Sequence, residues 1–309
     1  MKKNCYEYWR KAHFIRAQIV YLLGTKKDND VRELIKEQIA SDYLKKRYVD
    51  KYYKKIDKKM DYLENTPEKI VWLYWKQGLS NAPSIVKLCV GSVKETFEKN
   101  GWKVKIIDYK YVIENNLLPS FIYFKYEKKE INDAHFSDLV RLCLLNKYGG
   151  CWIDSTVLMT NNKIPVYIEY TPFFCYQNCQ KNTSYINISN WLISSCANNP
   201  ILEDVYNILL DYWKNEKIMI QYYGFHLIFK LVSEHYPTIW KNVFINSNIN
   251  PHILQTVMFE KIDKLNLDFI IKNSDFHKLT WRYPKTINKE SVISKIIKGE
   301  VEFKNINEE

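Results

Sequence analysis

A strand–helix–strand pattern over residues 69–107 limits the possible folds more than any other feature of the chain. Residues 69–75 (KIVWLYW) are β-branched and aromatic, which predicts a buried strand, and Pro83 stands where a helix can begin. Apolar residues from Ile85 to Phe97 then recur on one helical face, and residues 102–107 form a second strand. This order predicts a parallel βαβ unit and an α/β fold. No GxGxxG follows the first strand, which argues against a dinucleotide-binding Rossmann domain.

Hydrophobic periodicity and turn residues also predict helices and strands along the rest of the chain. They predict a helix over 134–148, a strand over 151–153, strands near 173–176 and 191–194, and helices over 200–213 and 219–236. With 309 residues, 46% of them hydrophobic, the chain can form one large domain or a domain with an appendage. A break at Thr66-Pro67 divides it into a helical segment, 1–65, and a main α/β domain, 66–309.

The N-terminal segment carries most of the net charge of +11, because residues 1–65 hold 17 Lys and Arg against 10 Asp and Glu. From Asp30 to Leu63 apolar and aromatic residues recur at helical intervals between lysines, which predicts amphipathic helices. Three interpretations are open: packing on the main domain, attraction to an anionic membrane surface or to a pyrophosphate-bearing lipid, and nucleic-acid binding. No nucleic-acid motif follows, so we expect no nucleic-acid partner.

The location of the chain is expected to be cytoplasmic, with peripheral attachment to the inner face of the cell membrane as an option through the N-terminal helices. No run approaches the roughly 18–20 apolar residues of a membrane span. The basic N-terminus lacks an uninterrupted apolar segment, so we do not expect a signal peptide. Seven scattered cysteines do not indicate a disulfide framework, and Cys175 with Cys179 is weak as a metal pair.

The segment AHFSDLVRLCLLNKYGGCWIDSTV, residues 134–157, is the most informative for chemistry. On a helix, His135, Asp138 and Arg141 lie near one stripe, while leucines occupy the other faces. A buried Asp and Arg are costly unless they are paired or used, so they form either a structural ion pair or a grip on polar substrate groups. After the two glycines a short strand ends at Asp154, where open α/β sheets place their ligands.

The run SDLVRLCLLNKYGGCWIDSTV resembles the signature of the capsular polysaccharide synthesis glycosyltransferases, relatives of the yeast-type initiating mannosyltransferases and the glucosylating clostridial toxins. Further blocks are similar to the family in the same order: IVWLYWKQGLSNAPSIVKLCVGSV, NWLISSCANNPILEDVYNILLDYWK, GFHLIFKL, NINPHILQ and SDFHKLTWR. Together they cover about residues 68–282. The resemblance implies a GT-A-type, Rossmann-like mixed sheet flanked by helices, with the N-terminal helical segment as an appendage.

The resemblance also implies a site for a UDP-sugar donor. Trp75 matches the tryptophan that stacks on uracil, with core packing as its alternative, and Asp138 with Arg141 matches the pair that holds the donor sugar. Asp154 matches the first aspartate of the family's Asp-x-Asp motif, and Lys278 is similar to the late lysine that reaches the diphosphate.

A divalent cation, Mn²⁺ or Mg²⁺, is the cofactor that the resemblance implies, with Asp154, Thr156 and His277 as its ligands. Thr156 stands where the wider superfamily has the second aspartate, the usual direct ligand. A threonine hydroxyl can coordinate magnesium, as in the P-loop, but it carries no charge. The metal is therefore the element of the site that the sequence supports least.

Three further residues belong to the expected reaction centre. Asn190 falls where such enzymes present a group to the reacting sugar, and Trp191 and His226 are acceptor-side candidates. Each has a structural alternative: Asn190 and Trp191 can cap and pack a strand, and His226 can be a core histidine.

The function that these features predict is a retaining transfer of a hexose, glucose or galactose, from a UDP-sugar to a lipid-linked capsular or cell-surface polysaccharide repeat unit. The acceptor would be a saccharide carried on a polyprenyl diphosphate. No second glutamate in the motif stands out as a covalent nucleophile, so front-face attack with the leaving phosphate as base is expected. A nucleotide-sugar hydrolase or sugar-phosphate transferase is one alternative. A catalytically weak sugar-nucleotide-binding or scaffold subunit of an assembly complex is the other.

Overall fold

A computed structural model of the chain describes residues 29–54, 65–178, 185–284 and 286–301. A central five-stranded sheet has the order β2-β1-β3-β6-β5, and β4 pairs with β7 in a separate two-stranded sheet. The strands are β1 (Ile70–Tyr74), β2 (Lys103–Ile107), β3 (Gly150–Ile153), β4 (Val157–Met159), β5 (Phe173–Gln177), β6 (Ile188–Ser195) and β7 (Phe276–Lys278). β1 is parallel to β2 and β3, and β6 is antiparallel to β3 and β5. The predicted mixed α/β sheet is confirmed.

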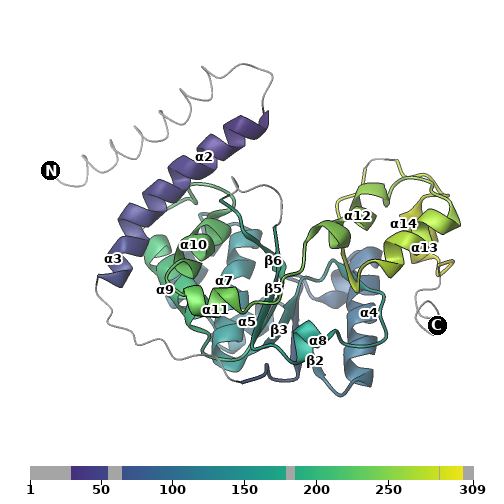
Figure 1. The fold of residues 1–309 in the computed structure, drawn as a ribbon, viewed down its shortest axis with the longest axis horizontal. Coiled ribbons are helices and arrows are strands. Elements are labelled where there is room, and N and C mark those ends of the chain that lie inside the picture. The colour runs from purple at the N-terminus through teal and green to yellow at the C-terminus, as the bar shows by residue number, and fades with distance from the viewer. Residues whose placement is uncertain (1–28, 55–64, 179–184, 285, 302–309) are drawn as a thin grey trace.

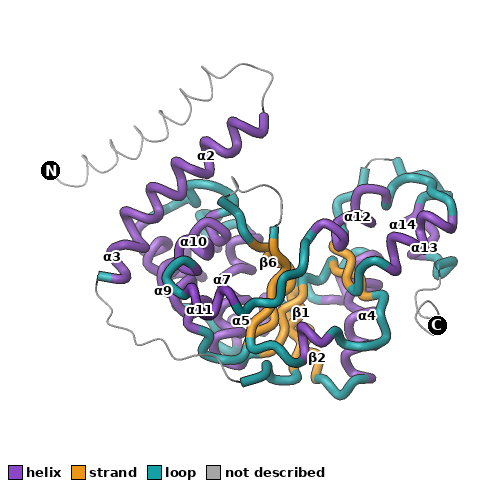
Figure 2. The backbone as a smooth tube through the Cα atoms, in the orientation of Figure 1, coloured by secondary structure: helices purple, strands orange, loops and turns teal. Residues whose placement is uncertain are grey.

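Helices cover both faces of the central sheet, as Figures 1 and 2 show. The N-terminal part holds α2 (Asn29–Leu44), the π-helix η1 (Lys45–Val49) and α3 (Asp50–Tyr53). The middle holds η2 (Leu79–Asn81), α4 (Ser84–Lys99), α5 (Tyr109–Glu114), α6 (Ser120–Glu127), α7 (Asp133–Tyr148) and α8 (Val166–Glu169). The C-terminal part holds α9 (Pro200–Asn215), α10 (Gly224–Ser233), α11 (Pro237–Lys241), α12 (Ile249–Val257), α13 (Lys264–Lys272) and α14 (Val292–Ile297).

Alternation along the central strands separates two hydrophobic cores. Side chains of successive residues in a strand point to opposite faces of a sheet. Trp72 and Trp152 therefore join a core with α7, α9 and α10, whereas Val71, Leu73 and Cys151 join a core with α4 and the C-terminal helices. Both faces are buried, which explains why the strands read as nearly continuous apolar runs.

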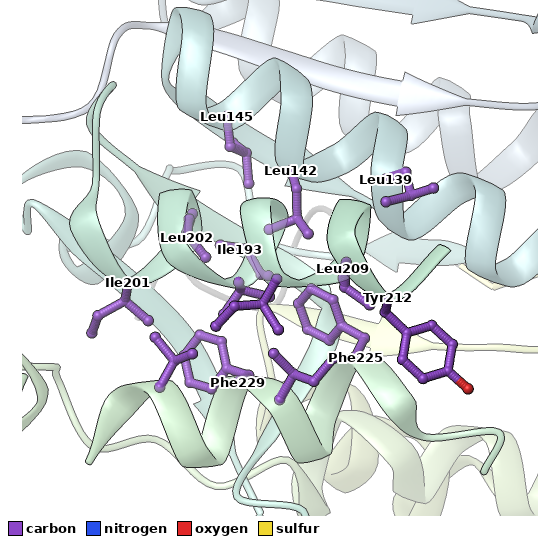
Figure 3. Close-up of a cluster of buried hydrophobic side chains, with 14 of the residues drawn as sticks. Leu139, Leu142, Leu145, Ile193, Ile201, Leu202, Leu209, Tyr212, Phe225 and Phe229 are labelled. Atoms are coloured by element: carbon purple, nitrogen blue, oxygen red, sulfur yellow. The ribbon is translucent and has the colours of Figure 1, made fainter. Parts of the chain in front are cut away.

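The core beside α7, α9 and α10 is dense in large apolar side chains (Figure 3). Leu142 and Leu145 of α7 and Phe225 and Phe229 of α10 are almost completely buried around Ile193 of β6. Each such side chain contributes about 1.5–3 kcal/mol relative to an exposed one. This packing holds α7, which carries Asp138 and Arg141, firmly against the sheet.

The described part of the N-terminal segment packs on the main domain. Tyr43, Leu44 and Tyr48 are buried in the same core as α9 and α10. Tyr43 and Tyr48 donate hydrogen bonds to Oε1 of the buried Glu216, at 2.6 and 2.9 Å. The aromatic side of this segment is thus used in packing for residues 29–54, while the rest of the predicted helix, 55–63, lies outside the described residues.

Two predicted element boundaries were wrong. The helix expected over 219–236 begins only at Gly224 and ends at Ser233. The Tyr212 hydroxyl donates to the carbonyl of Ile218 and accepts from the amide of Ile220, so it replaces helical backbone hydrogen bonds. The strand expected near 191–194 is longer, 188–195, because β6 pairs with both β3 and β5.

Candidate active site

Two glycines at the junction of α7 and β3 bring the informative motif to one edge of the sheet. Gly149 and Gly150 have φ of +64° and +93°, a region that side chains rarely adopt. A Cβ on Gly150 would lie 2.4 Å from the carbonyl oxygen of Ile70, and one on Gly149 would lie 2.8 Å from the amide of Ala197. The tight turn makes α7 run back along β3, so the start of the helix lies at the carboxyl end of the strand.

The same edge collects residues from four elements. Trp75 follows β1, Asp154 follows β3, and Lys278 ends β7. Asn190 lies near the amino end of β6, which is at this edge because β6 is antiparallel to β3. Ligands in open α/β sheets bind at the carboxyl ends of the parallel strands. This edge is therefore the candidate active site.

A chain of hydrogen bonds and ion pairs joins Asp138, Arg141, Asp154 and Lys278. Arg141 Nη1 donates to Asp138 Oδ1, and Arg141 Nη2 donates to Asp154 Oδ1 at 3.1 Å. Lys278 Nζ donates to Asp154 Oδ2 at 2.9 Å and to Thr156 Oγ1 at 2.6 Å. Both predicted carboxylates and both predicted cations thus form one network. The network is therefore larger than the structural ion pair between Asp138 and Arg141 that was the alternative.

Asn190 also belongs to this network. Its Nδ2 donates to Asp138 Oδ1 at 2.8 Å, the same oxygen that accepts from Arg141. The next residue, Trp191, has its side chain on the other face of β6, where it stacks on Tyr176 at 4.8 Å between ring centroids. It is 4% exposed in the core beside α4. The packing alternative therefore describes Trp191, and its expected place on the acceptor side is not supported by this geometry.

The two carboxylates differ in the pKa that their surroundings produce. Burial raises the pKa of Asp138, and the nearby Arg141 and His135 compensate only in part. Burial acts in the same direction on Asp154, but Lys278 and Arg141 together outweigh it, so the pKa of Asp154 is lowered. Asp154 is thus held as a carboxylate, and Asp138 is the member of the network whose charge is costly to bury.

His226 lies beside the network at the start of α10. Burial first, and then the charge of Arg141, lower the pKa of His226 to about 3. Its Nδ1 is buried and has no hydrogen-bond partner among the described residues. A neutral imidazole with an open nitrogen next to Arg141 fits the acceptor-side interpretation as well as the core one.

His277 is placed differently from the expectation. It is completely buried, and its Nε2 lies 3.3 Å from Thr160 Oγ1. Because neighbouring residues of a strand point to opposite faces, His277 points away from the face on which Lys278 reaches Asp154. The structure therefore does not bring His277 to Asp154 and Thr156, where the expected metal ligand would have to lie.

The expected metal site does not fit the residues that are present. Oδ1 of Asp154 accepts from Arg141 and from Trp152, and Oδ2 accepts from Lys278. Thr156 Oγ1 also accepts from Lys278. In the described ranges no three His, Cys, Asp or Glu side chains form a group able to hold a metal ion. Cys175 is buried in β5, and Cys179 lies outside the described residues.

Three aromatic residues at the site were not singled out from the sequence. Trp152 Nε1 donates to Asp154 Oδ1 at 3.0 Å, and its ring lies 4.9 Å from Arg141 Cζ. Trp281 packs edge-to-face on Trp75 at 5.8 Å. The backbone carbonyl oxygen of Tyr222 accepts a hydrogen bond from His135 Nε2 at 3.0 Å. Trp152 could have been found from the sequence, since a residue two positions before Asp154 shares its face of the strand.

Comparisons with known proteins agree with the motif analysis. A family model described as "Capsular polysaccharide synthesis protein" matches residues 21–296, so the chain belongs to this family. The O-glycosyltransferase PaGT of Phomopsis amygdali is 30% identical over 103 residues, 31% of this chain and 25% of that protein. Glycosyltransferase afumC of Aspergillus fumigatus (strain CBS 144.89 / FGSC A1163 / CEA10) is 32% identical over 98 residues, 29% of this chain and 25% of that protein.

The chain therefore spans about a quarter of the length of the curated relatives it matches. A solved structure named PaToxG Glycosyltransferase has 20% sequence identity and a TM-score of 0.39, over 68% of this chain and 81% of that one. Across the described residues, no helix is long and apolar enough to cross a membrane.

Proposed function

We propose that the chain is a glycosyltransferase that moves a hexose, glucose or galactose, from a UDP-sugar onto a lipid-linked capsular or cell-surface polysaccharide repeat unit. The observation that carries this proposal is the network of Asp138, Arg141, Asp154, Lys278 and Asn190 at the carboxyl edge of the sheet. Carboxylates and an amide suit sugar hydroxyls, and two cations suit a diphosphate. Membership of the family and the names of the relatives support the same class of reaction.

Open polar groups near the network support a bound ligand there. Four buried atoms without a hydrogen-bond partner among the described residues belong to side chains at this edge: the Tyr74 hydroxyl, Trp75 Nε1, Arg141 Nε and His226 Nδ1. Buried polar groups in native proteins are nearly always paired, so such a cluster calls for an explanation. A polar substrate that fills the site would supply the missing partners.

The residues suggest how the transfer would proceed. Cleavage at the anomeric carbon places negative charge on the leaving diphosphate, and Lys278 and Arg141 are the two cations at hand to stabilise it. Asp138, held by Arg141 and Asn190, would accept hydrogen bonds from the donor sugar. Both carboxylates are held in hydrogen bonds, so we propose retention by front-face attack, with the departing phosphate taking the acceptor proton.

The proposed acceptor is a saccharide on a polyprenyl diphosphate, reached from the membrane surface. Lys45, Lys46 and Lys51 remain exposed on the N-terminal helices after the tyrosines have been used in packing. Such a basic face would favour anionic lipid at about 1 kcal/mol per lysine. Replacing the three lysines by glutamine should reduce binding to anionic liposomes, and unchanged binding would remove this part of the proposal.

Calorimetry with UDP and a panel of UDP-hexoses tests the donor site. Wild type and Asp42→Asn, whose carboxylate is exposed on α2, should bind one UDP-hexose equally well. Asp154→Asn should bind at least about tenfold more weakly, because Arg141 and Lys278 lose their common partner. Transfer would then be followed by UDP release, and NMR of the product gives the anomeric outcome. No binding of any nucleotide by wild type would favour the scaffold alternative.

A further inference from the structure

The ammonium group of Lys278 occupies the position that a divalent cation would need. Its Nζ lies 2.9 Å from Asp154 Oδ2 and 2.6 Å from Thr156 Oγ1, the two oxygens that the Asp-x-Thr sequence offers. We propose that this chain acts on its donor without a divalent metal, and that Lys278 supplies the positive charge beside the leaving diphosphate. This inference rests on the proposed function and deepens it.

The first support is the saturation of the oxygens. Asp154 Oδ1 already accepts from Arg141 Nη2 and Trp152 Nε1, so the carboxylate has donors on both oxygens. A metal bound between Asp154 and Thr156 would lie within a few Å of the ammonium, and like charges at that distance repel strongly. A metal and Lys278 therefore compete for the same place.

The second support is the backbone that holds Lys278. It ends β7, and its partner in the antiparallel ladder with β4 is Val157, the residue directly after Thr156. The amide of Leu279 donates to the carbonyl of Thr156 at 2.9 Å, which anchors the strand on the other side of Lys278. The lysine side chain is only 19% exposed. The ladder thus directs Lys278, and not His277, to Asp154.

The third support is the chemistry of the substitution in the motif. A neutral threonine in place of an aspartate removes one negative charge from the site, and with it much of the attraction for a divalent cation. The hydroxyl that takes its place accepts from the ammonium instead. Asp138 and Asp154 are balanced by Arg141 and Lys278 without any further cation.

A third donor of the ammonium is open to a ligand. A lysine ammonium has three N–H groups, and Asp154 and Thr156 take two of them. In the part of the chain that the structure describes, no acceptor is found for the third. A phosphate oxygen of the donor would accept it, and Arg141 stands on the opposite side of Asp154 as a second cation.

The test compares UDP binding and UDP-hexose turnover in EDTA and in Mn²⁺, with wild type, Lys278→Met, Lys278→Arg and the exposed control Lys272→Met. Wild type and Lys272→Met should give the same Kd for UDP and the same turnover, within about twofold, in both buffers. In EDTA, Lys278→Met should bind UDP at least about tenfold more weakly and turn over about 100-fold more slowly, as expected for loss of a charge at a developing anion. Lys278→Arg keeps the charge and should retain more affinity than Lys278→Met.

Two results would overturn the inference: a wild-type Kd for UDP that weakens more than about tenfold in EDTA and recovers with Mn²⁺, or a folded Lys278→Met that binds UDP as wild type does in EDTA. Failure of the proposed function looks different, because wild type then binds no UDP in either buffer. Thermal unfolding of each variant shows whether it is folded. If Lys278→Met does not fold, the comparison of wild type in the two buffers decides the question alone.

Discussion

Carboxylates in two regions of the described chain are held in two different ways. At the sheet edge, Asp138 and Asp154 are held by Arg141 and Lys278, and several buried polar atoms nearby have no hydrogen-bond partner among the described residues. Where the N-terminal helices meet α9, Asp204 accepts hydrogen bonds from the hydroxyls of Tyr52, Tyr53 and Tyr236.

We call this second group the tyrosine clamp: Asp204 with Tyr52, Tyr53 and Tyr236, and Glu216 with Tyr43 and Tyr48. Tyrosine hydroxyls are neutral donors with a packed apolar ring, so they satisfy a carboxylate while filling a core. Cations on long side chains leave donors free for a ligand. We infer from this difference that the clamp joins elements of the fold, whereas the sheet edge is the proposed donor site.

The largest effect should come from Asp138→Asn. Turnover should fall about 100- to 1000-fold, because Arg141 and Asn190 lose the carboxylate that orders them around the sugar. The free energy of unfolding should fall by no more than about 2 kcal/mol, because burial makes the Asp138 charge costly, as its raised pKa indicates, and Arg141 keeps Asp154 as an ion-pair partner. UDP release assays measure the loss of turnover, and urea unfolding measures the change in the free energy of unfolding. A variant that loses stability but keeps activity would reverse our assignment.

The opposite result is expected for Asp204→Asn. The free energy of unfolding should fall by about 2–4 kcal/mol, because three tyrosine hydroxyls lose a charged acceptor. Turnover of the folded fraction should stay at the wild-type value. Urea unfolding measures the change, with Asp42→Asn on the exposed side of α2 as control. If Asp204→Asn lowered the free energy of unfolding no more than Asp42→Asn does, the clamp would have no role in joining the N-terminal helices to α9.

The pH dependence should separate the two regions as well. Burial lowers the pKa of His226 to about 3 in the folded protein. In the unfolded chain the same side chain has its ordinary pKa of about 6.5, so on acidification it binds a proton there while it stays neutral in the folded protein. Stability is therefore lost as the pH falls from 7 towards 4. The hydroxyls of Tyr52 and Tyr53 should not contribute, because burial raises their pKa and they stay protonated over this range.

Replacing His226 by Gln should reduce the loss of stability between pH 7 and pH 5 by about 1 kcal/mol, allowing for partial access of water to the ring. The remaining pH dependence comes from the other histidines whose pKa burial lowers: His235, His252 and His277, the last to about 4. Urea unfolding at both pH values measures this. An unchanged slope in His226→Gln would show that this histidine is solvated in the folded protein.

A smaller effect than that of Asp204→Asn is expected for Tyr53→Phe. The hydroxyl donates to Asp204 Oδ2 at 2.9 Å, and the ring stacks on His235 at 3.7 Å between centroids. Phenylalanine keeps the stacking and loses one hydrogen bond of three, so stability should fall by about 1–2 kcal/mol. Tyr170→Phe, at a position that is 66% exposed, is the matched control. A change no larger than that of the control would make the clamp weaker than the geometry suggests.

The sequence predicted the central part of the fold from local patterns. Helix and strand periodicity, the Gly149-Gly150 turn and the Asp-x-x-Arg spacing are properties of short segments, so they identified α4, α7 and the strands around them before any tertiary contact was known. The boundary at Gly224 was not predictable in this way. It depends on the Tyr212 hydroxyl, which comes from α9 and bonds to the backbone between the two helices.

The candidate site likewise has features that the sequence predicts and features that only tertiary contacts set. By itself, the sequence determined which residue types are available: the Asp and Arg on one helical stripe, Asp154 at a strand end, and a neutral Thr156 where a carboxylate is usual. Only the tertiary structure decided between neighbours such as His277 and Lys278, or Asn190 and Trp191, because the register of a strand sets which of two adjacent side chains reaches a given face. That choice depends on pairing between segments more than 100 residues apart, as the bond from Lys278 to Asp154 shows.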